Sequence, residues 1–216
     1  MEIKYLGHSA FEITTKEHKI LIDPYLITWP NYKVNEISNI FVTHGHSDHL
    51  GSAIDISKNT NAPITAVFEL ANYCAKQGAN IIDGGLGSWI EFNWGRAIMV
   101  PAFHSSSLPD GSYGGCPCGF VFEIENQVIY HAGDTCLNQE MKMIGEIYRP
   151  DIVMLPIGGK YTMDIEHAVI ASEWLGASEV IPMHYNTFDA INVDISDFET
   201  KIRKIGKVPR ILPISK

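Results

Sequence analysis

The sequence predicts an α/β fold in which two β-sheets are flanked by helices. Each half of the chain starts with strand-like runs and continues into helix-like segments, an order that differs from the regular strand–helix alternation of one parallel sheet. Of the 216 residues, 45% are hydrophobic, which is enough for a sizeable core. We therefore expect one compact domain over residues 1–216, an ordinary size for a single α/β unit.

Short apolar and β-branched runs open the first half. A turn at residues 16–18 separates two of them, and a later run ends abruptly at a polar cluster that begins with Thr43. A longer segment that Gly78 closes has a helical composition. The expected strands are residues 2–6, 10–14, 20–22, 39–42, 81–82, 89–92 and 97–101, and the expected helix is residues 66–77.

The second half repeats this order after a connection rich in glycine and proline. The connection, residues 108–119, is the clearest break between the two halves. Residues 125–126 predict a hairpin turn, Gly176 predicts a helix end, and Ser196 or Asp197 is the expected cap of the last helix. The expected strands are residues 120–124, 127–130, 152–155 and 180–182, and the expected helices are residues 137–147, 165–175 and 196–204.

Charge and hydropathy exclude several classes of protein. With 25 acidic and 16 basic side chains the net charge is −9, so we expect no nucleic-acid partner. The apolar runs are too short to span a membrane, which predicts no membrane partner. The first residues lack the basic and apolar segments of a signal peptide, so the expected location is cytoplasmic.

Side chains that can bind metals gather at the end of one expected strand. Four of them fall within six positions: His44, His46, Asp48 and His49. Residues two apart in an extended segment project to the same side, so His44 and His46 can bind one metal ion. Asp48 and His49 lie just beyond, where Gly51 allows the chain to turn toward a second position. Imidazole and carboxylate ligands suit Zn²⁺, and also Mn²⁺ or Fe.

The motif HxHxDH at residues 44–49 resembles that of the metallo-β-lactamase superfamily. Other runs are similar to one branch of it, the metal-dependent hydrolases related to ascorbate-6-phosphate lactonase. These runs are GHSAF at 7–11, LIDP at 21–24, HAGDT at 131–135, LPIGG at 155–159, YTM at 161–163 and IPMHYNTF at 181–188. The resemblance covers essentially the whole chain and implies the αββα sandwich of the metallo-β-lactamase fold.

The resemblance also implies two divalent metal ions per chain, with zinc expected first and manganese, iron or nickel as alternatives. Carried over onto the matching positions, it implies two ligand sets with Asp134 as a bridge between them. The first set is His44, His46 and His104, and the second is Asp48, His49 and His184. Asp23 is the expected acceptor for the outer ring nitrogen of a ligand histidine.

Such a centre implies a metal-dependent hydrolase whose metal-bound hydroxide attacks a small lactone, ester or phosphoester. Asp48 is expected to accept or relay a proton in addition to binding metal, and the candidates that protonate the leaving group are His8, Tyr161 and Tyr185. For His8, a metal-ligand or substrate-contact role and a purely structural role stay open. We expect a small-molecule substrate and a homo-oligomer, and residues 25–32 are a candidate pocket wall or subunit contact.

Two alternative functions remain open. A phosphodiesterase would need basic side chains near the centre, for which Lys160 is the main candidate, with Arg96 and Arg149 behind it. A non-catalytic protein that only binds metal or ligand would be expected to lack some ligands, whereas all seven are present. Cys116 and Cys118 are a weak candidate for a redox pair, against the simpler interpretation as reduced thiols.

Overall fold

Two β-sheets form the centre of the molecule, which a computed structural model describes over residues 1–26 and 32–214. In the described residues, the first sheet has six strands: β1 (Glu2–Gly7), β2 (Ala10–Thr14), β3 (Lys19–Ile22), β4 (Asn39–Phe41), β5 (Ile64–Val67) and β6 (Ile81–Gly84). The second has seven: β7 (Trp89–Phe92), β8 (Gly95–Pro101), β9 (Cys118–Ile124), β10 (Gln127–His131), β11 (Ile152–Pro156), β12 (Glu179–Met183) and β13 (Val208–Pro209). In both sheets, strands that are consecutive in sequence are neighbours in space.

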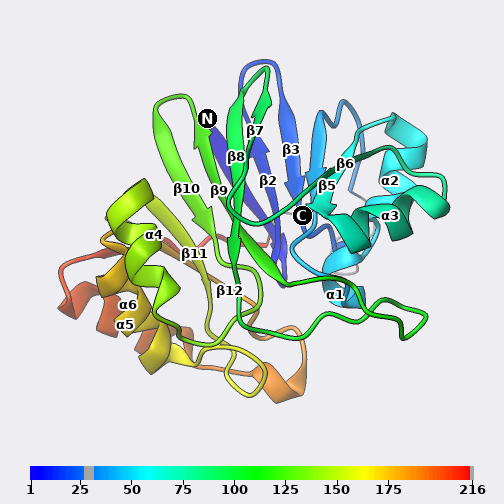
Figure 1. Cartoon of the computed structure of the whole chain (residues 1–216). Helices are drawn as coiled ribbons and strands as arrows, with labels where there is room; N and C mark the ends of the chain where they lie inside the picture. Colours follow the sequence, from blue (N-terminus) through cyan, green and yellow to red (C-terminus); the bar gives the residue numbers. More distant parts are fainter. Residues whose placement is uncertain (27–31, 215–216) are drawn as a thin grey trace.

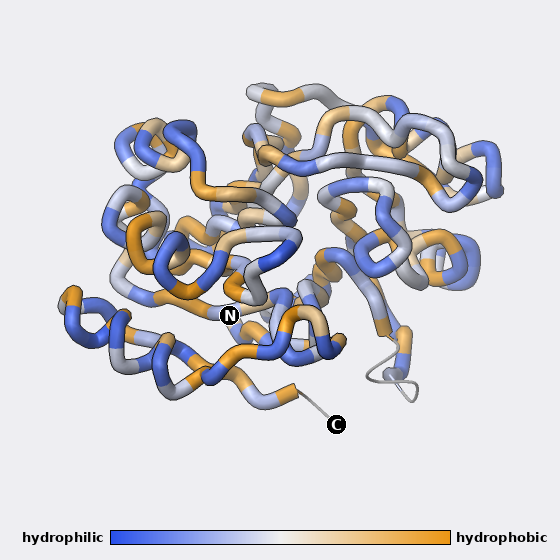
Figure 2. The backbone as a smooth tube through the Cα atoms, turned by 90° about the horizontal axis from the view of Figure 1, so that it is seen from below, coloured by the Kyte–Doolittle hydropathy of each residue, from blue (hydrophilic) through white to orange (hydrophobic). Residues whose placement is uncertain are grey.

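Helices cover the outer sides of both sheets, as the sequence predicts (Figure 1). In the first half of the chain, the one-turn helix α1 (Ser47–Leu50) follows β4, and α2 (Ala53–Thr60) and α3 (Phe68–Lys76) lie beside the first sheet. The second sheet is covered by α4 (Glu140–Tyr148), α5 (Ile165–Leu175) and α6 (Ile195–Lys204). Hydrophobic and hydrophilic residues alternate along the outer segments (Figure 2), as expected when only one helix face meets the core. No helix in the described part of the chain is long and apolar enough to cross a membrane.

Aromatic rings from both sheets interlock where the sheets face each other. Phe41 of β4 lies 5.1 Å from Phe120 and 4.9 Å from Phe122 of β9, measured between ring centroids, and both contacts are edge-to-face. Trp94 closes the same cluster and donates its indole N–H to Asn39 Oδ1 at 2.8 Å. These rings are buried, so their packing holds the two sheets in a fixed relation.

The strand directions bring several carboxyl ends to one edge of the molecule. Strands β10, β11 and β12 pair in parallel, and β8 runs the same way because two antiparallel pairings separate it from β10. In the first sheet, β4 and β5 also pair in parallel. The connections that follow these strands lie at the lower edge in Figure 1.

The predicted boundary between the halves is wrong. Residues 108–119 lie largely in the connection between β8 and β9, which pair antiparallel in the same sheet. The chain passes from one sheet to the other between β6 and β7, over residues 85–88. A glycine-rich composition marks a turn in the chain but does not say which strands the turn joins.

The helix predicted over residues 66–77 begins only at Phe68. Ala66 and Val67 belong to β5, which is fully buried between β4 and β6, so pairing in the sheet outweighs their local preference. Helix α2 was not predicted, the 137–147 helix begins only at Glu140, and the last helix is capped by Asp194 rather than Ser196 or Asp197. The Asp194 carboxylate accepts a hydrogen bond from the Ser196 amide at 2.9 Å.

Gly51 ends the turn that carries the predicted metal-binding motif. A substitution at this position tests how closely the turn packs against its neighbours. Its φ of 44° and ψ of −122° suit glycine, and a Cβ there would lie 2.5 Å from the Pro24 carbonyl oxygen. We expect Gly51→Ala to lower the free energy of unfolding by about 3 kcal/mol, as measured by urea titration. Gly78→Ala is the control, because Gly78 also has positive φ but open space around it, and about 1 kcal/mol is expected. Equal losses in the two variants would contradict the crowding at Gly51.

Candidate metal centre

The structure brings all seven predicted metal ligands to the lower edge of the sheets. They come from four connections: residues 44–49 follow β4, His104 follows β8, Asp134 follows β10 and His184 follows β12. Candidate ligand atoms lie within 4.8 Å of one another in two clusters, one made of His44, His46 and His104, the other of His8, Asp48, His49 and His184. A third group, His44, His49 and Asp134, joins a histidine of each cluster. The clusters correspond to the two predicted ligand sets, with His8 added to the second.

Asp134 lies between the two clusters, in the place predicted for a bridge. Its Oδ1 is 3.3 Å from His49 Nε2, and its Oδ2 is 3.0 Å from His184 Nε2 and 3.5 Å from His104 Nε2. The carboxylate is only 3% exposed, so three imidazoles rather than water surround it. A single residue therefore presents its two oxygens toward histidines of both sets.

Asp23 orients two of the histidines through one buried carboxylate. Its Oδ2 accepts hydrogen bonds from His49 Nδ1 at 2.7 Å and from the Thr43 hydroxyl at 2.7 Å. Because that hydroxyl donates its proton to Asp23, it accepts from His44 Nδ1 at 3.0 Å. Both rings therefore turn Nε2, the atom that can bind a metal, toward the centre. In neutral His44 this nitrogen is unprotonated, whereas His49 must release a proton before its Nε2 can bind a metal. This agrees with the outer-acceptor role predicted for Asp23, whereas Thr43 was missed, although it directly precedes the motif.

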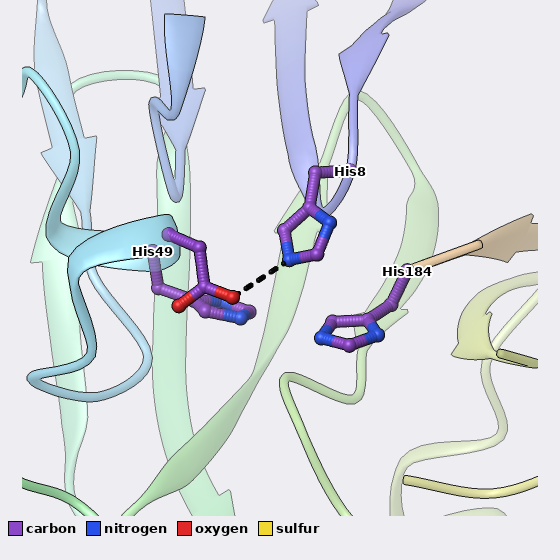
Figure 3. A group of neighbouring side chains, drawn as sticks. His8, His49 and His184 are labelled. Atoms are coloured by element: carbon purple, nitrogen blue, oxygen red, sulfur yellow. Dashed lines mark hydrogen bonds and ion pairs between the residues drawn. The ribbon is translucent and has the colours of Figure 1, made fainter. Parts of the chain in front are cut away.

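His8 completes the second cluster from a strained position at the end of β1. Its φ is 56°, and its ring faces those of His49 and His184 (Figure 3). Nε2 lies 3.1 Å from Asp48 Oδ2 and Nδ1 lies 3.2 Å from the Thr187 hydroxyl. The side chain is buried, so it belongs to the centre and not to the protein surface.

Burial holds most of these histidines in the neutral form. It lowers the pKa of His44 well below the ordinary value and also lowers the pKa of His46 and His104, with the neighbouring imidazoles acting in the same direction. Only a neutral imidazole can bind a metal, so the environment prepares these side chains for ligation.

The opposite shifts occur where His49 faces carboxylates. Burial alone would lower the pKa of His49, but Asp134 and Asp23 outweigh it and raise that pKa well above its usual range. Burial would raise the pKa of Asp134, but the nearby His49 and His184 outweigh burial and hold that pKa well below its usual range. A dication between His49 and Asp134 would replace this proton in balancing the buried carboxylates.

Several buried nitrogen and oxygen atoms of the centre lack a hydrogen bond, and a metal ion could satisfy some of them. Among the described residues, His49 Nε2, Asp134 Oδ1 and His184 Nδ1 are buried without a hydrogen bond of normal geometry. Leaving such atoms unpaired costs about 1–3 kcal/mol each. A divalent ion would satisfy the first two, which face each other, and the mixed histidine and carboxylate donors suit zinc and its neighbours. The residues present therefore fit a metal centre.

The two predicted tyrosines do not join the clusters in any described contact. Tyr161 is 56% exposed, and its ring lies beside the Lys160 amine at 5.3 Å. Tyr185 stacks on Tyr5 with ring centroids 6.3 Å apart, and burial raises its pKa. Ser105 was not predicted, yet its hydroxyl lies 3.4 Å from His46 Nε2. A serine close to a ligand histidine in sequence carries no distinguishing pattern.

The cysteine pair and the aromatic segment can also be placed. Cys116 is exposed, whereas Cys118 is buried, donates to the Thr43 carbonyl at 3.3 Å, and has its pKa raised well above the ordinary value by burial. A thiol held protonated in this way is a poor redox partner, which disfavours the pair.

Only part of the aromatic segment at residues 25–32 can be described, because residues 27–31 lie outside the described residues. The ring of Tyr25 lies 5.7 Å from that of His8, measured between centroids.

The residues of this centre lie within a match to a known protein family. A model described as a beta-lactamase superfamily domain matches residues 2–184. The chain belongs to this superfamily. A UPF0173 metal-dependent hydrolase of Staphylothermus marinus is 46% identical over 208 residues, which cover 91% of this chain and 89% of the relative. One of Bacillus cereus strain B4264 is 40% identical over 218 residues, covering 96% of both.

Solved structures agree with the fold. Igni18, described as a novel metallo hydrolase from the archaeon Ignicoccus hospitalis, superposes with a TM-score of 0.89 at 34% identity, covering 99% of this chain and 95% of its own. The metallo-β-lactamase fold protein YhfI of Bacillus subtilis has a TM-score of 0.75 at 11% identity, with coverages of 95% and 88%, and shows the fold alone. The predicted metallo-β-lactamase fold is confirmed.

Substitution of Asp23 tests the centre without replacing a predicted ligand. In Asp23→Asn the amide retains the shape but binds His49 and Thr43 less strongly, so we expect metal affinity to fall about 10–100-fold, measured by competition with a chelating dye. Asp194→Asn is the control, because asparagine caps a helix as well as aspartate and Asp194 is exposed. Unchanged affinity in Asp23→Asn would show that the carboxylate does not orient the histidines.

Proposed function

We propose that this protein hydrolyses a small lactone or ester at a centre of two divalent metal ions, held by the seven predicted ligands with Asp134 between them. The observation that carries the proposal is the position of Asp134, whose two oxygens face histidines of both clusters. Membership in the superfamily and the similarity to metal-dependent hydrolases support it. Zinc is the first candidate metal, and manganese, iron or nickel would fit the same donors.

Bound divalent ions would activate water near neutral pH and polarise the bond under attack. Hydrolysis of a lactone then breaks the acyl C–O bond, transfers the water oxygen to the new carboxylate, and moves a proton to the departing alcohol oxygen. The chain must therefore hold a proton close to the centre while the bond breaks.

Asp48 and His8 are the pair that can hold this proton. Burial would raise the pKa of Asp48, but the hydrogen bond from His8 and the nearby His49 outweigh it and lower that pKa, so the carboxylate stays ionised. Burial lowers the pKa of His8, and its Nε2–H donates to Asp48. Its Nδ1 lies 3.2 Å from the Thr187 hydroxyl, which itself donates to the Tyr185 carbonyl. This chain of contacts links the centre to Thr187, a half-buried residue. Tyr161 and Tyr185 stay predictions for the same task.

Loss of a predicted ligand tests the proposal most directly. We expect His46→Ala and Asp134→Ala to lose metal from one or both positions and to lower kcat/KM for γ-butyrolactone by at least about 10³-fold, since the metals supply both the activated water and charge stabilisation. His167→Ala is the control, because His167 is exposed and belongs to neither cluster. Elemental analysis of native, stripped and reloaded protein gives the metal count beside the rates. Full activity in either ligand variant, or metal without hydrolysis of any ester, would favour a binding role instead.

The role of His8 can be separated from metal binding. Asparagine tolerates the positive φ at this position, so His8→Asn should keep the turn intact. If His8 holds the proton, kcat falls by about 10²–10⁴-fold while metal content stays unchanged. His18→Asn, which removes a histidine bonded to Ser38, is expected to change neither quantity. A loss of metal in His8→Asn would instead make His8 a ligand.

A further inference from the structure

Exposed aromatic side chains gather at the edge that carries the candidate metal centre. In the part of the chain that the structure describes, those that are exposed are Phe68, Phe103, Tyr113, Tyr161 and Phe188, at fractions between 44% and 64%. Each lies in a connection, or at a helix start, that follows the carboxyl end of β5, β8, β11 or β12. Phe103 directly precedes His104, and the Phe188 ring lies 5.4 Å from that of His8. A group of exposed rings on one edge indicates a binding surface. An apolar ligand that covered these rings would remove apolar area from water, which stabilises the complex.

A cavity includes Phe68 and Tyr113 of this aromatic edge among its lining residues. It has a volume of about 540 Å³ and lies between α3 and the connection from β8 to β9. Its apolar walls are Phe68, Tyr73, Leu108 and Tyr113. Leu108 packs against Gly45, where an added Cβ would lie 3.0 Å from Leu108 Cδ2, and the Gly45 amide donates to Ser106 Oγ at 3.1 Å. The cavity wall is thus attached to the turn that carries the first two predicted ligands.

The arginines lie away from this edge. Arg96 pairs with Glu123, Arg210 with Glu179 and Arg203 with Glu199, while Arg149 ends α4 just before β11 begins. Glu179 is the first residue of β12, so its partner Arg210 sits at the end of the sheet opposite to the centre. In the cavity, Lys76 is accompanied by Glu69 and Asp110. No described arginine is therefore available to clamp a phosphate or carboxylate group of a substrate there.

We infer that the substrate is an uncharged ester or lactone with an apolar chain or ring, and that this group lies in the cavity between Phe68 and Tyr113. The inference rests on the proposed hydrolase function and makes it specific. It disfavours the phosphodiester alternative, because no described arginine lies at this edge. Lys160, the main basic candidate for that alternative, follows β11 at the same edge, and its amine lies 5.3 Å from the Tyr161 ring. Each methylene that the cavity buries is expected to raise kcat/KM by up to about fourfold.

The test uses γ-butyrolactone, γ-hexalactone and γ-decalactone, with bis-p-nitrophenyl phosphate as the anionic comparison, on the zinc-loaded protein. We expect kcat/KM to rise at least tenfold from γ-butyrolactone to γ-decalactone and to be lower for the phosphodiester. Tyr113→Ser and Phe68→Ser remove exposed rings, so folding should persist. Both are expected to raise KM for γ-decalactone about tenfold, with kcat and the values for γ-butyrolactone within twofold.

Met143→Ser is the matched control, because Met143 is 51% exposed on α4, which covers the second sheet rather than the cavity. It should leave every lactone value unchanged. Rates that do not depend on chain length, a preference for the phosphodiester, or equal effects of Met143→Ser and Tyr113→Ser would overturn the inference while leaving the hydrolase function standing. Absence of hydrolysis with all four compounds would overturn the proposed function itself.

Discussion

The buried Asp23 carboxylate is the interaction on which the arrangement of the centre depends. It accepts from the Thr43 amide at 2.8 Å, from the Thr43 hydroxyl and from His49, so it joins the end of β3 to the turn after β4 and to α1. A carboxylate that is fully buried and has three donors is stable only while all three remain in place. The orientation of His44 and His49 therefore depends on a residue that is not itself among the predicted ligands.

Backbone strain accompanies this network. His8, Asp23 and His184 are non-glycine residues with positive φ, between 43° and 56°, and such conformations cost of order 1–3 kcal/mol each. Local hydrogen bonds offset part of that cost: the His184 amide donates to the His8 carbonyl at 2.6 Å, and the Tyr5 hydroxyl donates to the same oxygen at 2.9 Å. The strain turns His8 and His184 toward each other from strands of different sheets, which regular strand geometry would not do.

The two ends of the sheets have different chemistry. At the carboxyl ends of β4, β8, β10 and β12 lie the histidine clusters and the exposed aromatic rings, whereas the paired arginines lie elsewhere. Loops at one edge of a rigid scaffold can vary without disturbing the core, which here is held by the interlocked rings around Phe41. In the proposed function, the ligand set would define the class of reaction, and the surrounding aromatic edge would select the substrates.

The sequence by itself determined two sheets flanked by helices and the cluster at residues 44–49, because these are local patterns, and the family resemblance of its motifs supplied the full set of seven candidate ligands. Most strands followed from apolar runs, and α5 was predicted at its observed bounds of Ile165–Leu175. Only the tertiary structure decided that Ala66 and Val67 form a strand, that residues 108–119 connect neighbours within one sheet, and that Thr43 and His8 belong to the centre. These features depend on contacts between residues far apart in the chain, and such contacts leave no periodic trace in the sequence.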